Sequence, residues 1–415
     1  MKIAIVHPSY NIKGGAENLM HWLASGLAGR GHRVTMFTAD FSRELWDDDW
    51  DTRVELVSLQ PGLLSRVINS KRVKILEYGN QLSKMLDSFD VIFCSLFPTH
   101  LWIAHAKRRN SIHAQIVWYL QEPSRKFYWR ITDPHLMELE KQSVGAEYNR
   151  HLRRCLSILL DRDNPSKMRR QISWDRKAVK HIDLILANSR FSADNITRAF
   201  GVPAHVCYPG IPTDSQPLQK TASGEYLLAV ARFSLRKNVQ NIIEAMHIVS
   251  ERHGRKDIPL KIVGQGPCQA ELESLVHERN LNSQVEFLGF LDDRELAEAY
   301  KRARLTIYLP IDEPFGLIAV ESMYRGVPPI VSDHGGLAEI VVHGETGLHV
   351  NPFDPVHVAQ GVVSLWDDQS TIQKMALAGR RRVEENFTET HLIDRVETLI
   401  LDTNNDTNKW FEGFR

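Results

Sequence analysis

Short runs of apolar, often β-branched residues alternate along the whole chain with stretches in which apolar positions recur at helical spacing. This alternation is typical of parallel sheets whose two faces are covered by helices. In the first half the predicted strands are Ile3–His7, Arg33–Thr38, Val54–Leu59, Val91–Leu96, Gln115–Leu120 and Leu184–Asn188. Helices are predicted between them, for example over Ala16–Gly29 and Val73–Asp87. The first half is therefore interpreted as a doubly wound α/β domain.

The pattern stops over residues 213–223, where a polar stretch without apolar periodicity indicates a linker. It restarts with predicted strands at Tyr226–Ala231, Leu260–Val263, Val285–Leu288, Leu305–Leu309 and Pro329–Ser332 and helices near Val239–Ser250, Gln269–Glu278 and Arg294–Arg302. The predicted fold class is α/β, with two Rossmann-like domains facing across a cleft. The domains are 1–212 and 224–385, followed by a helical segment, 386–415, for which packing back on the first domain is one option.

One connection is far longer than the others. About sixty residues separate the strand that ends near Gln121 from the one that begins at Leu184, well above the usual connection length. We treat residues 123–181 as an insertion in the first domain. It begins Arg-Lys-Phe-Tyr-Trp-Arg from position 125, and residues 148–180 hold ten basic and three acidic side chains. This composition suits peripheral contact of 125–180 with an anionic membrane or a lipid-linked acceptor. A helical subdomain with a solvated basic face is the alternative.

Composition narrows the class of protein. The chain has 415 residues, 43% hydrophobic and 25% charged, which is enough apolar material for two cores. Lys and Arg together number 51, as do Asp and Glu, so the net charge is zero. A protein that binds nucleic acid over a broad face usually carries a basic excess, and we predict no nucleic-acid partner. The excess of seven positive charges over 148–180 is balanced elsewhere in the chain.

Cysteine usage and hydropathy indicate the compartment. Cys94, Cys155, Cys207 and Cys268 are far apart and form no C-x-x-C motif, so we expect buried thiols in a reducing environment. The apolar run Ile3–Val6 is too short for a signal peptide, and no apolar stretch of 18 residues occurs. The expected localisation is cytoplasmic, with at most a peripheral contact at the inner membrane face.

Glycines lie at two predicted strand-to-helix turns. Gly14 and Gly15 precede the first helix, and Gly264 and Gly266 follow a strand of the second domain. Glycines there let backbone amides approach a ligand, and a helix N-terminus favours an anion such as a diphosphate. A purely structural glycine turn is the alternative in both places. The second pair lacks a third glycine in register, so the dinucleotide-binding fingerprint is not met.

Charged residues follow other strands of the second domain. Arg232 and Lys237 come after its first strand, where two cations suit the phosphate of a departing leaving group; solvated basic residues in a turn are the alternative. The segment from Pro310 to Ser322 carries Glu313 and Glu321 with seven residues between them, the first in a loop and the second in a helix. Carboxylates accept hydrogen bonds from the vicinal hydroxyls of sugars and riboses.

Taken together, these motifs resemble those of glycosyltransferase family 4, the retaining enzymes of the two-Rossmann-domain GT-B class. The likeness covers nearly the whole chain. It rests on the Gly14-Gly15 loop, Arg232 with Lys237, Gly264-Gln-Gly266, Val285 to Gly289, the Glu313/Glu321 block, Gly326 to Ser332 and Gly335 to Glu339.

The resemblance implies roles for individual residues. Arg232, Lys237 and Glu313 would be the catalytic residues, with the two cations on the donor diphosphate and Glu313 on the donor sugar. Glu321 would take the ribose hydroxyls and the main chain around Phe287–Phe290 the nucleobase. The full implied donor-binding set is Gly14, Gly15, Gln121, Gly264, Gly266, Leu288, Gly289, Phe290, Phe315, Gly316, Leu317 and Glu321. No metal and no cofactor is implied, since the nucleotide sugar is a substrate.

Two features depart from relatives. A histidine commonly follows the fifth strand, whereas this chain has Gln121 and Glu122 at that place, and one of them would have to serve. The long basic insertion is the second departure, from the shortest members of the family. His100 follows the fourth strand; one option is that it faces the cleft, but we expect a structural or solvated side chain. Asp47 and Asp49 form a D-x-D, the metal-binding signature of another glycosyltransferase fold, but no apolar strand precedes them and a solvated acidic loop is expected.

The predicted function is retaining, metal-independent transfer of a sugar from a UDP- or GDP-sugar to a glycan, lipid-linked or small-molecule acceptor. Fixed cations and helix N-termini would stabilise the charge that develops on the departing nucleoside diphosphate. One alternative is a catalytically silent partner protein that retains the nucleotide-sugar site. A GT-B epimerase or phosphorylase is a further alternative.

Overall fold

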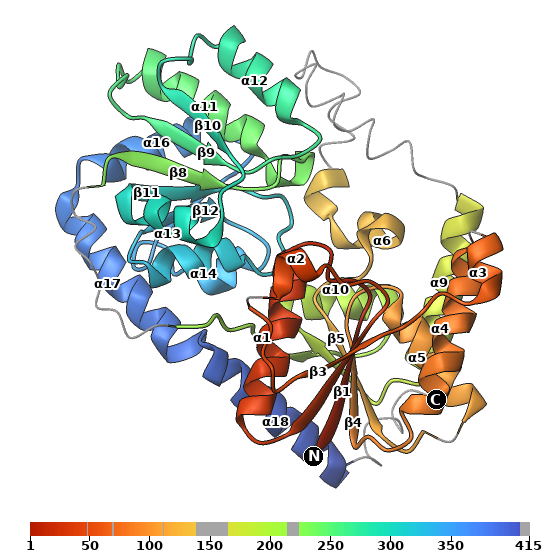
Figure 1. Ribbon diagram of the computed structural model, residues 1–415. Helices are drawn as coiled ribbons and strands as arrows, with labels where there is room; N and C mark the ends of the chain where they lie inside the picture. The colour runs from red at the N-terminus through yellow and green to blue at the C-terminus, as the bar shows by residue number, and fades with distance from the viewer. Residues whose placement is uncertain (48, 69, 111, 138–164, 214–223, 407–415) are drawn as a thin grey trace. The chain divides into compact units, whose positions relative to one another are not determined.

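The computed structural model describes residues 1–47, 49–68, 70–110, 112–137, 165–213 and 224–406 (Figure 1). The chain forms two compact units. Unit 1 comprises Met1–Thr132, Asn164–Thr213 and Phe387–Arg415, and unit 2 comprises Asp133–Asp163 and Asp214–Asn386.

Unit 1 is built on a seven-stranded parallel sheet with the strand order β3-β2-β1-β4-β5-β6-β7. Its strands are β1 (Lys2–His7), β2 (Arg33–Thr38), β3 (Glu55–Ser58), β4 (Val91–Cys94), β5 (Gln115–Leu120), β6 (Leu184–Ala187) and β7 (His205–Val206). The order reverses between β1 and β4, which makes this pair the switch point where open α/β sheets bind ligands.

Helices cover both faces of this sheet (Figure 1). They are α1 (Gly15–Gly29), α2 (Arg43–Trp46), α3 (Leu63–Val67), α4 (Lys71–Met85), α5 (Thr99–Arg109), α6 (Arg125–Thr132), α9 (Pro165–Val179), α10 (Arg190–Phe200) and α18 (Glu389–Asp406). Alternate residues of β1 enter two separate cores, with Ala4 and Val6 on one face and Ile3 and Ile5 on the other. Two-sided burial explains why the strands are apolar without a break.

Unit 2 repeats this architecture with six parallel strands in the order β10-β9-β8-β11-β12-β13. The strands are β8 (Tyr226–Val230), β9 (Leu260–Val263), β10 (Val285–Gly289), β11 (Ala303–Tyr308), β12 (Pro329–Ser332) and β13 (Leu348–Val350). The helices are α11 (Val239–Glu251), α12 (Gln269–Glu278), α13 (Asp293–Arg302), α14 (Leu317–Tyr324), α15 (Leu337–Ile340), α16 (Pro355–Trp366) and α17 (Gln369–Asn386), with a 3₁₀ turn at Leu235–Lys237. The switch point lies between β8 and β11.

The C-terminal helix α18 packs on α1 of unit 1 (Figure 1). Leu392, Ile393 and Val396 of α18 are buried in the core that also contains Ile3 and Ile5. At Gly26 of α1 a Cβ atom would lie 2.5 Å from Ile393 Cδ1, so the absence of a side chain there allows the two helices to pack closely.

The segment treated above as an insertion divides between the units. Its first helix, α6, belongs to unit 1, and there Phe127, Tyr128 and Trp129 are buried at 9%, 1% and 6% exposure. The aromatic residues that suggested a membrane contact therefore belong to the core. Residues 133–137 belong to unit 2. Residues 138–164, which carry part of the basic excess, lie outside the described residues.

The described thiols match their prediction: Cys94, Cys207 and Cys268 are buried and unbridged. Cys155 lies outside the described part of the chain. Among the residues that the structure describes, no helix is both long enough and apolar enough to span a membrane.

Candidate active site

The loop after β8 carries the two predicted phosphate-binding cations. Arg232 is exposed, and its guanidinium makes no hydrogen bond or ion pair with any residue that the structure describes. Lys237 ends the 3₁₀ turn a few residues later. Both lie at the carboxyl edge of the sheet of unit 2, the edge at which such sheets bind ligands.

Lys237 forms hydrogen bonds with side chains of β11 and of the loop that follows it. Its ammonium donates hydrogen bonds to the Tyr308 hydroxyl at the end of β11 (2.7 Å) and to Glu313 Oε2 (2.8 Å). Burial opposes the charged form, but Glu313 and Tyr308 together raise the pKa of Lys237. Burial, followed by the charge of Glu313, raises the pKa of Tyr308. At neutral pH the site therefore holds an ammonium, a neutral phenol and a carboxylate.

Gly264 and Gly266 pack against the backbone of the β8 loop. A Cβ at Gly264 would lie 1.9 Å from Ala231 O, and one at Gly266 would lie 2.3 Å from Phe233 O. Gly264 also has a φ of +134°, which L-residues rarely adopt. These glycines let the loop after β9 reach the residues on either side of Arg232, so their direct role is to position that loop.

The loop between β11 and α14 is held in an unusual conformation. Asp312 has a φ of +52°, and Gly316, the N-cap of α14, has a φ of +106°. The Gly336 amide donates to Glu313 O at 2.7 Å, and a Cβ at Gly335 would lie 2.7 Å from that same carbonyl oxygen. Phe315 is buried, and α14 begins at Leu317. The amides of the first turn of α14 therefore point toward the region that precedes Gly316.

Glu321 lies on α14 beside Tyr300. Burial raises the pKa of Glu321 to about 7, although Arg325 partly offsets this. The buried Tyr300 hydroxyl lies beside this carboxylate, and its hydrogen bonding also lowers the pKa of Glu321. Arg325 lies over the Tyr300 ring, 5.0 Å from its centroid. The carboxylate therefore lies in a partly desolvated environment, where added hydrogen-bond donors would stabilise its charged form.

The predicted base-binding segment ends β10. Leu288 and Gly289 are partly buried, and Gly289 has a φ of +72° with no atom closer than 3.9 Å to the position of a Cβ. Phe290, the next residue, is 73% exposed. The Gly289 carbonyl accepts a hydrogen bond from the Gly264 amide at 2.8 Å, so the segment presents chiefly an uncovered aromatic ring at the carboxyl edge of the sheet.

Three predicted donor-binding residues belong to unit 1. Gly14 and Gly15 mark the start of α1, and Gln121 follows β5. The Gln121 Nε2 atom is buried without a hydrogen-bond partner among the described residues. Glu122, its neighbour, forms an ion pair with Arg125. Unit 1 therefore leaves Gln121, rather than Glu122, with unused hydrogen-bonding capacity.

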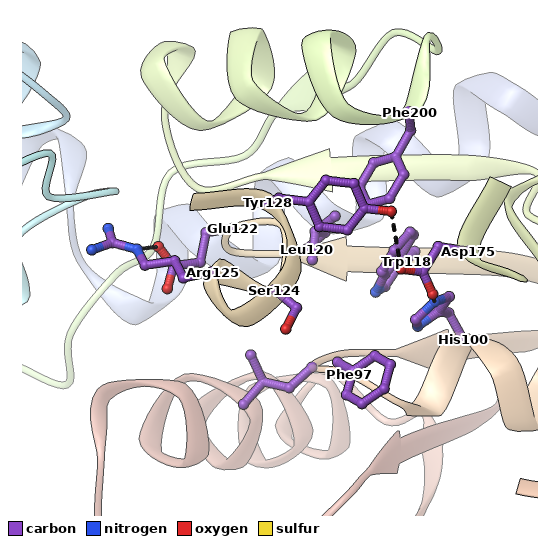
Figure 2. Close-up of a pocket in the computed structure, with 11 residues that line it drawn as sticks. Phe97, His100, Trp118, Leu120, Glu122, Ser124, Arg125, Tyr128, Asp175 and Phe200 are labelled. Carbon is purple, nitrogen blue, oxygen red and sulfur yellow. Dashed lines mark hydrogen bonds and ion pairs between the residues drawn. The ribbon is translucent and has the colours of Figure 1, made fainter. Parts of the chain in front are cut away.

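A cavity of about 270 Å³ lies at the carboxyl ends of β4 and β5 (Figure 2). Its walls are mostly aromatic and apolar: Leu96, Phe97, Trp118, Leu120, Tyr128 and Phe200. Asp175 of α9 accepts hydrogen bonds from Tyr128 (3.0 Å) and Gln171 (2.7 Å) and lies 3.1 Å from His100 Nε2.

His100 is accordingly not solvated. It is 1% exposed, and its ring stacks on Trp118 with a centroid distance of 4.2 Å. The structure therefore supports a structural role for His100, and the ring also lines the cavity.

One described cluster has the composition of a metal site. Ligand atoms of His135, Asp312 and His334 lie within 4.8 Å of one another in unit 2. Two of the three side chains are already hydrogen-bonded to each other, since His135 Nδ1 lies 2.7 Å from Asp312 Oδ1. The third, His334, accepts from the Asp312 amide at 3.3 Å. The hydrogen bond to Asp312 raises the pKa of His135, and burial lowers that of His334. The absence of a metal from the predicted site stays a prediction.

Sequence reasoning missed Tyr308, Tyr300 and Asp312 as parts of the site. Tyr308 was counted as a strand residue, although a polar side chain at the carboxyl end of a central strand is a usable signal. Tyr300 lies on α13, and nothing in the local sequence connects it with Glu321 on another helix. Asp312 lies next to Glu313 inside the recognised motif.

Two parallel sheets with reversed strand order, and a cation and carboxylate cluster at the edge of the second, are features of GT-B glycosyltransferases. The model described as Glycosyltransferase Family 4 matches residues 13–215, and that described as Glycosyl transferases group 1 matches residues 211–382. The chain belongs to glycosyltransferase family 4 and is a glycosyltransferase. The predicted fold class of two Rossmann-like domains is confirmed.

Relatives cover nearly the whole chain. An uncharacterized glycosyltransferase of Methanocaldococcus jannaschii is 26% identical over 93% of this chain and 94% of its own length. The human alpha-1,3/1,6-mannosyltransferase ALG2 is 28% identical over 93% of this chain and 92% of its own. Among solved structures, Anabaena Alr3699/HepE in complex with UDP and glucose has a TM-score of 0.72 at 17% identity, covering 97% of this chain and 100% of that one.

Proposed function

We propose that this protein transfers a sugar from a UDP- or GDP-sugar to a glycan, lipid-linked or small-molecule acceptor, with retention of anomeric configuration and without a metal ion. The observation that carries the proposal is the arrangement at the β8 edge. An unpaired Arg232 lies on the same short loop as Lys237, whose ammonium is 2.8 Å from Glu313. Support also comes from the similarity to ALG2, named a mannosyltransferase, and to HepE, whose structure contains UDP and glucose.

The chemistry needs charge stabilisation at one place. As the bond between the sugar C1 and the diphosphate oxygen breaks, negative charge grows on the diphosphate and positive charge on the sugar ring. Arg232 can bind a phosphate in a bidentate manner, and Lys237 adds a point charge. Two fixed cations stabilise the leaving group as a divalent metal does in other enzymes, which is the reason for proposing metal independence.

Glu313 and Glu321 take the hydroxyl groups. Glu313 with the amides around Phe315 and Gly316 would hold the donor sugar, and Glu321 would accept hydrogen bonds from the ribose. The new glycosidic bond forms on the face from which the diphosphate departs. The proton of the acceptor hydroxyl passes to a donor phosphate oxygen, so that the products are the glycoside and the protonated nucleoside diphosphate.

The acceptor side belongs to unit 1. We propose that the basic side chains of α9 attract an anionic acceptor or an anionic membrane surface. Arg169, Arg170, Arg176 and Lys177 are exposed on this helix. The aromatic residues of α6 take no part in such a contact, because they are buried.

The experiment that tests the function is a donor screen. Purified protein is incubated in EDTA with UDP-glucose, UDP-galactose, UDP-N-acetylglucosamine and GDP-mannose, each with a cell extract as the source of acceptor, and the release of nucleoside diphosphate is measured. We expect release from one donor. Nucleotide binding without release would favour the silent partner, and a requirement for inorganic phosphate would favour a phosphorylase.

A further inference from the structure

A chain of three polar side chains lies at the switch point of the sheet in unit 1. His7 is the last residue of β1, Ser95 directly follows β4, and Glu17 lies in the first turn of α1. Ser95 Oγ is 2.7 Å from His7 Nδ1, and His7 Nε2 is 3.8 Å from Glu17 Oε1. His7 and Ser95 are fully buried, and the Glu17 side chain is 11% exposed.

Ser95 connects the His7 ring with the backbone of β1. Ser95 Oγ lies 2.7 Å from His7 Nδ1 and 3.4 Å from Val6 O. The His7 Nε2 atom is buried and has no hydrogen-bond partner among the described residues, and Glu17 Oε1 lies 3.8 Å from it. With the ring proton on Nε2, His7 would offer it to the Glu17 carboxylate.

Glu17 is not explained as a helix cap. It occupies the third position of α1, where a glutamate often accepts a hydrogen bond from the N-cap amide. Glu295 does this at the same position of α13, accepting from the Asp292 amide at 3.0 Å. The N-cap of α1, Gly14, makes no such contact with Glu17, whose carboxylate has no hydrogen bond to any described residue.

Gly14 leaves room for this carboxylate. A Cβ at Gly14 would lie 2.6 Å from Glu17 Oε2, closer than atoms of side chains approach one another. The glycine that the sequence predicts to approach a diphosphate therefore also allows the Glu17 carboxylate to lie over the start of α1. The Glu17 carboxylate and an anionic ligand would lie in the same small space and repel each other. Glu17 therefore favours a neutral ligand with hydroxyl groups at this point.

Trp118 links this chain of side chains with the aromatic cavity. It donates through Nε1 to Ser95 O at 2.6 Å, and its ring forms a wall of the cavity that Figure 2 shows, whereas Glu17, His7 and Ser95 do not line that cavity. Aromatic walls suit a sugar ring, whose C–H faces pack on aromatic rings.

We propose that Glu17, oriented by His7 and Ser95, binds a hydroxyl group of a neutral sugar acceptor. This inference rests on the proposed function and names a residue of its acceptor side. Glu17 accepts a hydrogen bond from a hydroxyl group next to the attacking one and so orients the acceptor sugar. The attacking oxygen forms the new bond to C1 as the bond from C1 to the diphosphate breaks, and the proton of the attacking hydroxyl goes to the diphosphate. His7 and Ser95 are positioning residues.

The first test is binding of simple glycosides to unliganded protein. The ring ¹⁵N signals of His7, assigned with His7→Gln, are recorded with methyl α-mannoside, methyl α-glucoside and methyl α-galactoside as probes. At least one probe is expected to shift the Nε2 signal, and Glu17→Gln is expected to abolish that shift. A His7 signal that none of the three moves would overturn the proposal.

The second test separates the acceptor side from the donor side. Glu17→Gln is expected to raise the KM of the acceptor glycoside at least about tenfold, the effect of losing one charged hydrogen bond, with the KM of the donor unchanged. His7→Phe should act in the same direction, and His7→Gln, which retains a donor near Nε2, should restore most of the loss. Glu295→Gln is the matched control and should leave the acceptor KM unchanged.

The two proposals fail in different ways. If the wild-type protein released no nucleoside diphosphate from any donor, the proposed function would fall while the glycoside titration still reported on Glu17. If transfer occurred but Glu17→Gln kept the wild-type acceptor KM, the role of Glu17 would fall and the transferase activity would stand.

Discussion

Arg232 and Lys237 carry the same charge in different surroundings. Lys237 is held between Tyr308 and Glu313, whereas the Arg232 guanidinium is exposed and without a partner among the described residues. An exposed arginine without a partner contributes little to stability, so the proposed role of Arg232 should be visible in activity alone. Loss of Lys237 would in addition leave Glu313 without its cation.

The first prediction concerns Arg232→Ala. We expect a loss of roughly 10²–10³ in kcat with an unchanged thermal unfolding midpoint, because one preorganised charge opposite the leaving group is removed. The measurement is release of nucleoside diphosphate under saturating donor. Arg302→Ala, which removes an exposed ion pair with Glu225 in the same unit, is the control and should keep full activity. Full activity in Arg232→Ala would exclude this residue from the site.

The second prediction uses the raised pKa of Glu321, which is about 7 in the folded unit against an ordinary value of 4.5. Between these values the unfolded chain has released the proton and the folded chain still holds it, so this group lowers stability as pH rises from 4.5 to 7. Above 7 the contribution is constant. Glu321→Gln removes the effect and should gain about 2–3 kcal/mol relative to wild type between pH 4.5 and 8.

Denaturant unfolding of the unliganded protein at several pH values measures this difference. The relative gain of Glu321→Gln should develop within the window from 4.5 to 7 and stop there. A difference between the two proteins that does not change with pH would show that the Glu321 carboxyl is not desolvated in the folded unit.

For single residues, the sequence predicted which residues are candidates for the site better than it predicted which side chains they contact. Charged residues after strands were found, because the carboxyl edge of a parallel sheet follows from strand prediction alone. The side chains that contact them were missed, since Tyr308 and Glu313 come from elements distant in sequence from Lys237. The space beside Gly264 and Gly266 is filled by the loop after β8, and their approach to a ligand stays a prediction.

Among the elements, α18 shows how a distant segment completes a unit. Its residue Ile393 is 2% exposed and packs on α1 at Gly26. The third prediction is that Ile393→Ala costs about 2–5 kcal/mol of unfolding free energy, through lost burial and the cavity that remains. Leu401, 52% exposed on the same helix, is the control, and Leu401→Ala should change stability by less than about 0.5 kcal/mol. Equal effects of the two substitutions would contradict the packing of α18 described here.

The fourth prediction concerns the basic side chains of α9 and binding to anionic vesicles. Replacing Arg169, Arg170 and Arg176 by serine should reduce co-sedimentation with vesicles that contain phosphatidylglycerol, by about 1 kcal/mol for each charge removed. Replacing the exposed Arg252, Lys256 and Lys301 of unit 2 is the control and should leave vesicle binding unchanged. Wild-type protein that does not bind such vesicles would leave α9 as a solvated basic face.

Element prediction succeeded where burial is two-sided and failed where strands are short. The long strands of both sheets were found within about two residues, the usual precision of such boundaries. The edge strands β7 and β13, of two and three residues, were missed because so few positions carry no periodicity. The length of the connection placed α6 in an insertion, and its mixture of cations with aromatic side chains suggested a membrane contact, whereas the aromatic side chains are buried.

At the scale of the molecule, the proposed halves of the site lie on two sheets with the same reversed order. The cations and carboxylates proposed to bind the donor lie on unit 2, and the residues proposed to bind the acceptor, with the aromatic cavity, lie on unit 1. The zero net charge of the chain combines a basic α9 with an acidic remainder, so that charge separates by unit rather than cancelling locally. The two-domain class of the fold could be predicted from the sequence. The identities of the sugar and the acceptor could not, because they depend on contacts among few side chains.

The product of one transfer reaction tests retention and metal independence together. The donor identified by the screen is supplied with ¹³C at C1, the reaction is run with excess EDTA, and the anomeric configuration of the product is determined by NMR. We expect the product to keep the configuration of the donor and to form at the same rate with and without EDTA. An inverted product, or loss of transfer in EDTA that Mg²⁺ or Mn²⁺ restores, would contradict this expectation.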